Sequence, residues 1–232
     1  MIRLLSAALA TTALLGATQA EAAARNFPVG GFGRIQSNVP FDVQVHTGAA
    51  PSVHAQGPQE ALDRLIVEVV NGELVIRSRS GSWFSGWNWH RERAIIDVTV
   101  PMLTAATLSG PGDLTIDRIQ ARGFGGTLRG PGNLSIGSLE TGDVTLTLEG
   151  PGDIRVNGRA VTAHVTLRGP GDVKAAGLTV RDATVNLGGP GDISLTATGT
   201  VSGALTGPGD IDIRGGARCQ ISKHGPGDVS CH

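Results

Sequence analysis

Apolar and polar residues alternate along the second half of this chain, and one four-residue motif interrupts the alternation at nearly constant intervals. Apolar residues stand two positions before each motif, directly after it and two positions further on, with mostly polar residues between them. This period-2 pattern predicts two short strands that flank a turn and bury one face each. The motif is Gly-Pro-Gly-Asp, with Asn as the last residue of one copy, and its first glycines are Gly110, Gly130, Gly150, Gly169, Gly189, Gly207 and Gly225.

The interval of 18 to 20 residues between copies indicates a solenoid, in which each repeat forms one coil and stacks on its neighbours. We therefore predict an all-β fold, a right-handed parallel β-helix of 18–20-residue coils with Gly-Pro-Gly-Asp turns, preceded by an N-terminal β-rich part. The column two residues before the motif holds leucine in six copies and Lys223 in the last. A charged residue there suits a terminal coil, because no further coil buries that position.

Each motif is expected to form a type II turn, in which Pro fixes its own φ and the second Gly supplies a positive φ. The last residue of each copy is expected to cap its turn by accepting nearby backbone N–H groups. A row of calcium sites is the alternative, although the calcium-binding repeats of β-helices have nine residues and a different pattern. The predicted turn ladder consists of Asp113, Asn133, Asp153, Asp172, Asp192, Asp210 and Asp228.

The residues before the repeat carry strand and turn signals of their own. Asn71-Gly72 separates two alternating runs, which predicts a β-hairpin with a type I′ turn because both central residues need positive φ. Pro58 precedes a predicted helical turn over residues 59–65, since Pro is favourable at the start of a helix. Strands are expected at 41–46, 52–56, 66–70, 73–77 and 94–100.

The first 24 residues have the character of an export signal. Arg3 supplies a positive charge, an apolar run follows, and Ala20-Glu21-Ala22 or Ala22-Ala23-Ala24 offers a small-residue cleavage site. We expect a signal peptide at 1–24, an N-terminal β-rich part at 25–103 and the repeat at 104–232, with the last two in one continuous domain. The predicted location is the periplasm, the outer surface or the medium, with no transmembrane segment after cleavage.

The two cysteines fit an oxidising compartment, where a pair separated by a short loop is expected to form a disulfide. Cys219 and Cys231 both fall on inward columns of the final coil. A bridge between them is expected to hold the end of the solenoid, with a stabilisation of about 2–3 kcal/mol. A zinc site with His224 and His232 is the alternative, but the spacing matches no standard Cys/His site.

Residues 80–93 break the strand pattern and hold all three tryptophans of the protein. One interpretation is an exposed aromatic surface for a glycan, a partner protein or a membrane. The other is a hydrophobic lid over an open end or side of the solenoid core. The candidate binding patch consists of Trp83, Phe84, Trp87, Trp89, Arg91 and Arg93.

Composition narrows the classes of function. A net charge of −1 gives no electrostatic reason to expect nucleic-acid binding. His164 and His224 are isolated, and no serine has the context of a nucleophile elbow. We expect no catalytic residues, no cofactor and no metal site. A glycan-cleaving enzyme would need paired carboxylates, whereas the outward column after the turns reads Thr115, Ser135, Arg155, Lys174, Ser194, Asp212 and Ser230.

Four parts of the chain carry a pattern known from one family, namely Phe41–Val45, Leu74–Ile76, Ile96–Leu103 and the turn series from Ser109. Together they resemble the bacterial DUF2807 family, described as a putative auto-transporter adhesin head (GIN) domain. The resemblance covers residues 34–232, with Gly-Pro-Gly in place of the Gly-Ser-Gly that is usual in the turns of the family. It implies a pectin-lyase-like β-helix of exported proteins, with adhesion as the proposed role and no recognised catalytic residues.

We therefore expect an exported, non-enzymatic β-helix protein of the bacterial cell envelope that acts in adhesion or surface interaction. Its partner would be a surface glycan or protein that the sequence does not identify. The alternatives are a glycan-active enzyme of the pectin-lyase type and a purely structural envelope component. Exposed strand edges and flat Thr-rich faces also allow self-association.

Overall fold

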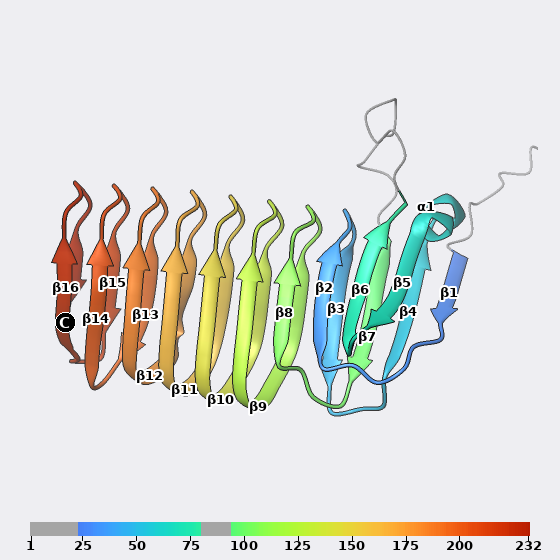
Figure 1. The fold of residues 1–232 in the computed structure, drawn as a ribbon, viewed down its shortest axis with the longest axis horizontal. Helices are drawn as coiled ribbons and strands as arrows, with labels where there is room; N and C mark the ends of the chain where they lie inside the picture. The colour runs from blue at the N-terminus through green and yellow to red at the C-terminus, as the bar shows by residue number, and fades with distance from the viewer. Residues whose placement is uncertain (1–22, 80–93) are drawn as a thin grey trace, which may run out of the picture.

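The computed structural model describes residues 23–79 and 94–232, and these form one 17-stranded sheet that winds into a solenoid (Figure 1). The repeat makes about six turns, which confirms the predicted parallel β-solenoid. The predicted signal peptide lies outside the described residues except for Ala23 and Ala24, which begin the first strand.

The chain before the first repeat turn holds eight strands and the only helix of the described residues. In chain order these are β1 (Ala23–Phe27), β2 (Arg34–Asn38), β3 (Asp42–Thr47), β4 (Ser52–Gly57), α1 (Gln59–Arg64), β5 (Leu65–Val70), β6 (Glu73–Ser78), β7 (Ile95–Val100) and β8 (Ala105–Leu108). The repeat holds the other nine strands, β9 (Leu114–Leu128), β10 (Leu134–Leu148), β11 (Ile154–Leu167), β12 (Val173–Leu187), β13 (Ile193–Ala197), β14 (Thr200–Leu205), β15 (Ile211–Arg214), β16 (Arg218–Lys223) and β17 (Val229–Cys231).

Strands β9 to β12 each run most of the way round one coil and pair in parallel with equivalent residues of the next coil. Leu128, for example, pairs with Leu148, which pairs with Leu167. Like residues therefore stack along the axis and form a continuous apolar core. The six leucines of the predicted inward column are buried, namely Leu108, Leu128, Leu148, Leu167, Leu187 and Leu205, whereas Lys223 is exposed.

The local predictions for the N-terminal part are confirmed. Strands β5 and β6 form an antiparallel hairpin, and φ is 50° at Asn71 and 73° at Gly72, as a type I′ turn requires. The helical turn after Pro58 is α1. Strands lie at each of the other expected places, with boundaries that differ by one or two residues.

The coil that adjoins the repeat on its N-terminal side lacks the repeat motif. β2 pairs in parallel with β8, and β3 pairs in parallel with β9, so β2 and β3 extend the stack toward the N-terminus. The turn between them, Val39-Pro40-Phe41-Asp42, stands where the repeat has Gly-Pro-Gly-Asp. Its Pro and its Asp match the motif, while Val39 and Phe41 replace the glycines and are buried.

The order of coils along the axis differs from their order in the chain. β6 and β7 pair in parallel with β2 and β3 on the side away from the repeat. The chain therefore first forms the coil of β2 and β3 and then adds β6 and β7 on its N-terminal side. It then continues with β8 and β9 on the opposite side. Beyond β6 and β7, strands β5 and β4 pair antiparallel to them, and β1 pairs antiparallel to β4. Helix α1 covers this end with Ala61 and Leu62, each 1% exposed (Figure 1).

The predicted type II turn is wrong. In the described residues, positive φ at glycine occurs only at Gly48, Gly72, Gly158, Gly203, Gly215 and Gly216, and none of these lies in a Gly-Pro-Gly-Asp or Gly-Pro-Gly-Asn turn. The motif needs glycine for a different reason, which is space between coils. A Cβ atom on Gly132 would overlap with the carbonyl group of Gly112 in the preceding turn, and the other motif glycines meet the turn before them in the same way.

Candidate functional site

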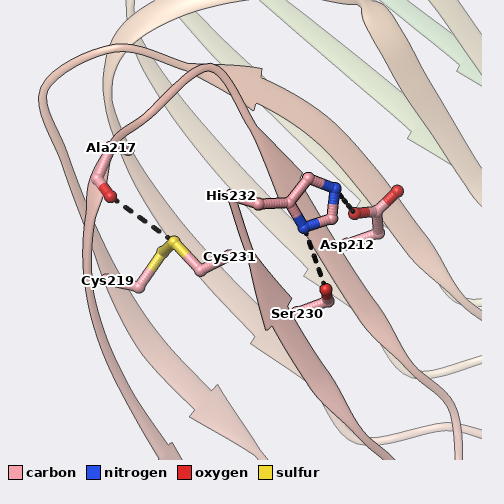
Figure 2. Close-up of a disulfide and its surroundings, with 6 residues drawn as sticks. All are labelled: Asp212, Ala217, Cys219, Ser230, Cys231 and His232. Carbon is pink, nitrogen blue, oxygen red and sulfur yellow. Dashed lines mark hydrogen bonds and ion pairs between the residues drawn. A yellow bond between two sulfur atoms is a disulfide. The ribbon is translucent and has the colours of Figure 1, made fainter.

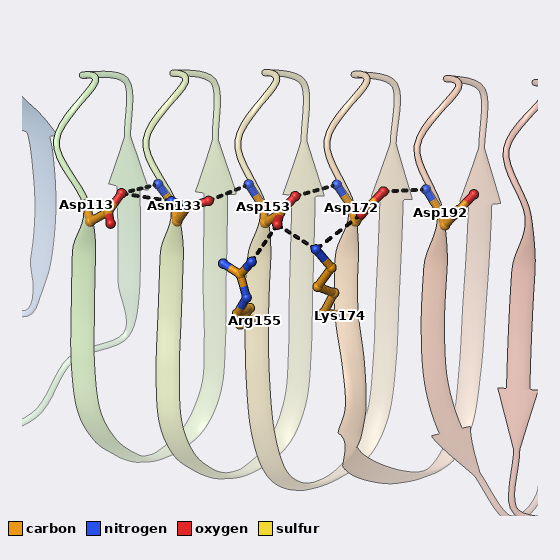
Figure 3. Close-up of polar contacts among 7 residues, drawn as sticks. All are labelled: Asp113, Asn133, Asp153, Arg155, Asp172, Lys174 and Asp192. Carbon is orange, nitrogen blue, oxygen red and sulfur yellow. Dashed lines mark hydrogen bonds and ion pairs between the residues drawn. The ribbon is translucent and has the colours of Figure 1, made fainter.

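The last residues of the turns form a hydrogen-bonded row along one edge of the solenoid, which we call the aspartate ladder (Figure 3). From Asn133 onward, the backbone N–H of each member donates to Oδ1 of the member in the preceding coil, at 2.7–3.1 Å. The carbonyl oxygen of the same residue accepts an N–H from the preceding coil at 2.9 Å. Each ladder residue therefore joins two coils by two hydrogen bonds.

The ladder extends one step further than the repeat motif. The backbone N–H of Asp113 donates to Oδ1 of Asp42 at 3.2 Å, and the N–H of Val43 donates to the carbonyl oxygen of Asp113 at 2.8 Å. Asp42 is thus the first member, in the coil without the motif. The spacing of Pro40 and Asp42 was the sequence signal for it, because both match the motif where its glycines do not.

Two cations compensate the middle of the ladder. Arg155 Nη2 and Lys174 Nζ each lie 2.7 Å from Oδ2 of Asp153, and Lys174 also lies 3.2 Å from Asp172 (Figure 3). Partial burial favours the neutral form of Asp153, but hydrogen bonds from Lys174 and from the Asp172 N–H outweigh it and lower the pKa of Asp153. The hydrogen bond to Asp153 likewise raises the pKa of Lys174.

Between Asp172 and the last member, Asp228, the ladder is less compensated. Within the described residues, Asp192 and Asp210 have no cationic partner, and together with Asp172 and Asp212 they line a hollow of about 360 Å³. The Oδ1 atoms of Asp192 and Asp210 accept hydrogen bonds from the backbone N–H groups of Asp210 and Asp228. No group of three or more His, Cys, Asp or Glu side chains in the described part of the chain is placed to hold a metal ion.

The predicted disulfide between Cys219 and Cys231 is confirmed and joins β16 to β17 in the final coil (Figure 2). The two Cα atoms are 6.5 Å apart, and the bridge spans 12 residues. Cys219 packs against the core, whereas Cys231 is exposed, and among residues 23–79 and 94–232 β17 pairs only with β15. The bridge therefore lies at the edge of the core and not inside it.

A serine, a histidine and an aspartate meet beside the disulfide, a combination that the sequence did not indicate (Figure 2). Ser230 Oγ lies 3.1 Å from His232 Nδ1, and His232 Nε2 lies 3.6 Å from Asp212 Oδ1. The second distance is too long for the hydrogen bond that orients the base in a nucleophilic triad. Ser230 and His232 are also exposed on the terminal strand, so the group lacks an enclosed site.

The candidate binding patch at 80–93 lies outside the described residues, as do all six of its members, from Trp83 to Arg93. The positions of the flanking residues follow from the strands to which they belong. β6 ends at Ser78 and β7 begins at Ile95, and their pairing with β2 and β3 puts these two ends at the edge of the solenoid where the turns lie. Residues 80–93 thus connect the same two faces that Val39–Asp42 connects in the next coil.

In-register coils, turns joined by an aspartate ladder and a separately covered N-terminal end define this protein as a parallel β-solenoid whose repeat serves its architecture. The chain belongs to the DUF2807 family, described as a putative auto-transporter adhesin, head GIN domain, which matches residues 31–217. No curated protein matches the chain. No helix in the described residues has the length and apolar character needed to cross a membrane.

Solved structures share the fold along nearly the whole chain. A putative adhesin from Bacteroides fragilis is 22% identical with a TM-score of 0.84, and the match covers 92% of this chain and 98% of that one. A putative lipid binding protein from Parabacteroides distasonis is 21% identical with a TM-score of 0.71, covering 91% and 97%. A putative adhesin from Parabacteroides merdae is 14% identical with a TM-score of 0.69, covering 91% and 96%.

Proposed function

We propose that this chain is an exported, non-enzymatic protein of the bacterial cell envelope that acts in adhesion or surface interaction. Its contact site is the aromatic patch of Trp83, Phe84, Trp87, Trp89, Arg91 and Arg93. The names of the family and of two structures with the same fold support the role, since all three are described as putative adhesins. The partner is a glycan or a protein on a surface.

The observation that carries this proposal is the cover over the N-terminal end of the core. α1 and β4 bury Leu62, Val53 and Ala55 to 2% exposure or less, so the described residues already close this end. A solenoid with a covered end has no need of a second hydrophobic lid. This supports the aromatic residues of 80–93 as a contact surface in preference to a lid.

The polar groups of the repeat support a non-enzymatic protein. The ladder carboxylates use Oδ1 to join coils, and the middle of the ladder is neutralised by Arg155 and Lys174. Hydrolysis of a glycan needs two carboxyl groups free to act on one bond. The ladder carboxylates instead hold neighbouring coils together.

A surface-attachment assay with matched variants tests the proposal. The purified protein without residues 1–22 is labelled and applied to bacterial and host cells and to a glycan array, beside a W83A/W87A/W89A variant. We expect the variant to lose attachment and to keep the unfolding temperature of the wild type within a few degrees. Met102→Ala is the control, because it removes a 51% exposed apolar side chain at the other end of β7.

The outcomes separate the two interpretations of the patch. Undiminished attachment of the tryptophan variant would contradict the proposed contact site. A large loss of stability, together with a wild-type protein that attaches to nothing, would establish the lid. Release of new reducing ends from any glycan on the array would contradict the non-enzymatic part of the proposal.

A further inference from the structure

A shallow hollow of about 680 Å³ lies on the face of the solenoid that β9, β10 and β11 form at the middle of each strand. Arg122, Gly142 and Val161 occupy equivalent positions in these three successive coils, as the pairing of the residues on either side of them shows. Gly142 lines the hollow without a side chain, and a Cβ atom there would lie 2.8 Å from the carbonyl oxygen of Arg122. The hollow therefore depends on the three different residues that stand at this one position in successive coils.

Arg122 brings an uncompensated charge to this hollow. Its side chain is exposed and has no hydrogen bond or ion pair within residues 23–79 and 94–232. Asp143, the acid beside Gly142 in the next coil, is occupied elsewhere, since it accepts a hydrogen bond from Thr162. The guanidinium is thus free to bind an anion from solution.

The other lining residues set the character of the ligand. Val161 is 48% exposed and, with Ala160, presents an apolar surface beside the arginine. Glu140 and Arg159 form a loose pair at 3.8 Å across the hollow. Two arginines and one glutamate leave one net positive charge, which matches a ligand with a single negative charge.

We propose that this hollow binds an acidic sugar unit of a surface polysaccharide. The carboxylate of the sugar binds the Arg122 guanidinium through two parallel hydrogen bonds. The C–H face of the ring packs on Val161 and Ala160, and ring hydroxyls donate to Glu140 and accept from Arg159. A dianion such as phosphate fits less well, because its second charge lies close to Glu140.

This inference rests on the proposed function, since it supplies one chemical class of surface ligand for it. The site is distinct from the aromatic patch in sequence and lies several strands away from β6 and β7 along the stack. Binding of an acidic sugar and attachment through the tryptophans are therefore separable, and each has its own variant.

Titration calorimetry with oligogalacturonate tests the inference on the protein without residues 1–22. The same oligosaccharide as its neutral methyl ester and inorganic phosphate serve as the other two probes. We expect oligogalacturonate alone to bind, with an affinity that falls about tenfold or more in Arg122→Gln. The affinity of Arg122→Lys is expected to lie between those of the wild type and Arg122→Gln, because lysine keeps the positive charge but cannot form two parallel hydrogen bonds to a carboxylate.

Arg218→Gln is the matched control, since it removes an exposed arginine from β16, far along the stack, and should leave the affinity within twofold. Absence of oligogalacturonate binding, equal binding of the methyl ester, or an Arg122→Gln variant with unchanged affinity would each overturn the inference. If Arg122→Gln loses the oligosaccharide and the protein attaches to no surface, the proposed function fails and the site stands. If attachment persists and no acidic sugar binds, the site fails and the proposed function stands.

Discussion

Lys223 Nζ lies 2.8 Å from Oδ1 of Asp228, in the last turn of the aspartate ladder. In each earlier turn of the repeat, the corresponding Oδ1 accepts a backbone N–H from the next coil. The lysine ammonium takes the place of that N–H, and its hydrogen bond lowers the pKa of Asp228. Lys223 thus ends the ladder, and it also puts a charge in the column where the earlier coils have leucine.

A charge at this place protects the open edge of β16 and β17 from pairing with another strand. We expect Lys223→Leu to increase association between copies of the chain in a concentration-dependent way, because it leaves an apolar residue on an exposed strand edge. Sedimentation velocity over a hundredfold range of concentration measures this. Lys223→Arg keeps the charge and should match the wild type, and a leucine variant that also matches it would refute the protective role.

Two glycines of the repeat differ in the space around them, which gives a matched pair of substitutions. A Cβ atom on Gly132 would overlap with the carbonyl group of Gly112, and backbone in the preceding coil cannot move aside cheaply. At Gly125 the same atom would meet nothing within 4 Å. We expect Gly132→Ala to lower the free energy of unfolding by about 3 kcal/mol or to prevent folding, and Gly125→Ala to change it by less than about 1 kcal/mol.

Chemical denaturation monitored by circular dichroism measures both changes. Equal stabilities for the two alanine variants would show that the turns can separate to accept a side chain. That result would remove the steric explanation for the repeated glycines, which rests on contact between coils and not on positive φ.

The solenoid itself could be predicted because its cause is visible in the chain. Each coil must bury the same face and make room at the same corner, so Leu114 and Gly132 recur with their equivalents at a fixed step. The N-terminal coil was missed for the same physical reason. Val39 and Phe41 replace the glycines in its turn and are buried there, so the motif that marks the other turns is absent from the sequence at this coil.

The order of the coils and the hydrogen bonding of the ladder could not be predicted from the sequence. β3 pairs with β7, 53 positions further along the chain (Asp42 with Ile95), and with β9, 71 positions further along (Val43 with Leu114), and no local pattern encodes such contacts. The oxygen of each ladder residue could have capped its own turn, and only the stacking directs it to the next coil instead. Arg122 gave no signal, because its lack of an acidic partner depends on the hydrogen bond that Asp143 accepts from Thr162.

The charge on Asp153 makes the stability of the ladder dependent on pH. Because the folded pKa of Asp153 is lowered, its contribution is fully present above the unfolded value, near pH 4, and is lost as the pH falls through the lower folded value. Asp153→Asn keeps an Oδ1 acceptor, as Asn133 does naturally, and removes the attraction to Lys174 and Arg155. We expect it to cost about 1 kcal/mol or less at pH 7.

Denaturation of the wild type and of Asp153→Asn at pH 7, 4 and 2.5 measures this contribution. The difference between the two proteins should shrink at the lowest pH, where the wild-type carboxyl is protonated as well. Asn133→Asp is a control of opposite sign, because it adds a charge between Asp113 and Asp153. A difference that stays constant across the pH range would contradict an electrostatic origin.

Strand β1 distinguishes between the two cleavage sites suggested by the leader. Ala23 pairs with Gly57 and Ala24 with Gln56, so cleavage after Ala22 keeps β1 whole and cleavage after Ala24 removes two of its five residues. We predict that the exported protein begins at Ala23, which intact-mass spectrometry of the periplasmic fraction measures. Protein that begins at Arg25 should unfold at a lower temperature than protein that begins at Ala23. Recovery of the shorter form alone, with the same stability, would contradict the prediction.

The disulfide is expected to hold the last coil and to have little effect on the others. Coils of a solenoid contact only their neighbours, so loss of the bridge should open β16 and β17 before it affects β9 to β12. For a loop of this size the bridge contributes about 3 kcal/mol to that coil. Hydrogen exchange measured by mass spectrometry, before and after reduction, should show faster exchange over Arg218–Lys223 and Val229–Cys231 only. A C219S/C231S variant should exchange as the reduced protein does, and reductant should not change its exchange further. Unchanged exchange of the wild type on reduction would show that the strands hold the terminal coil without the bridge.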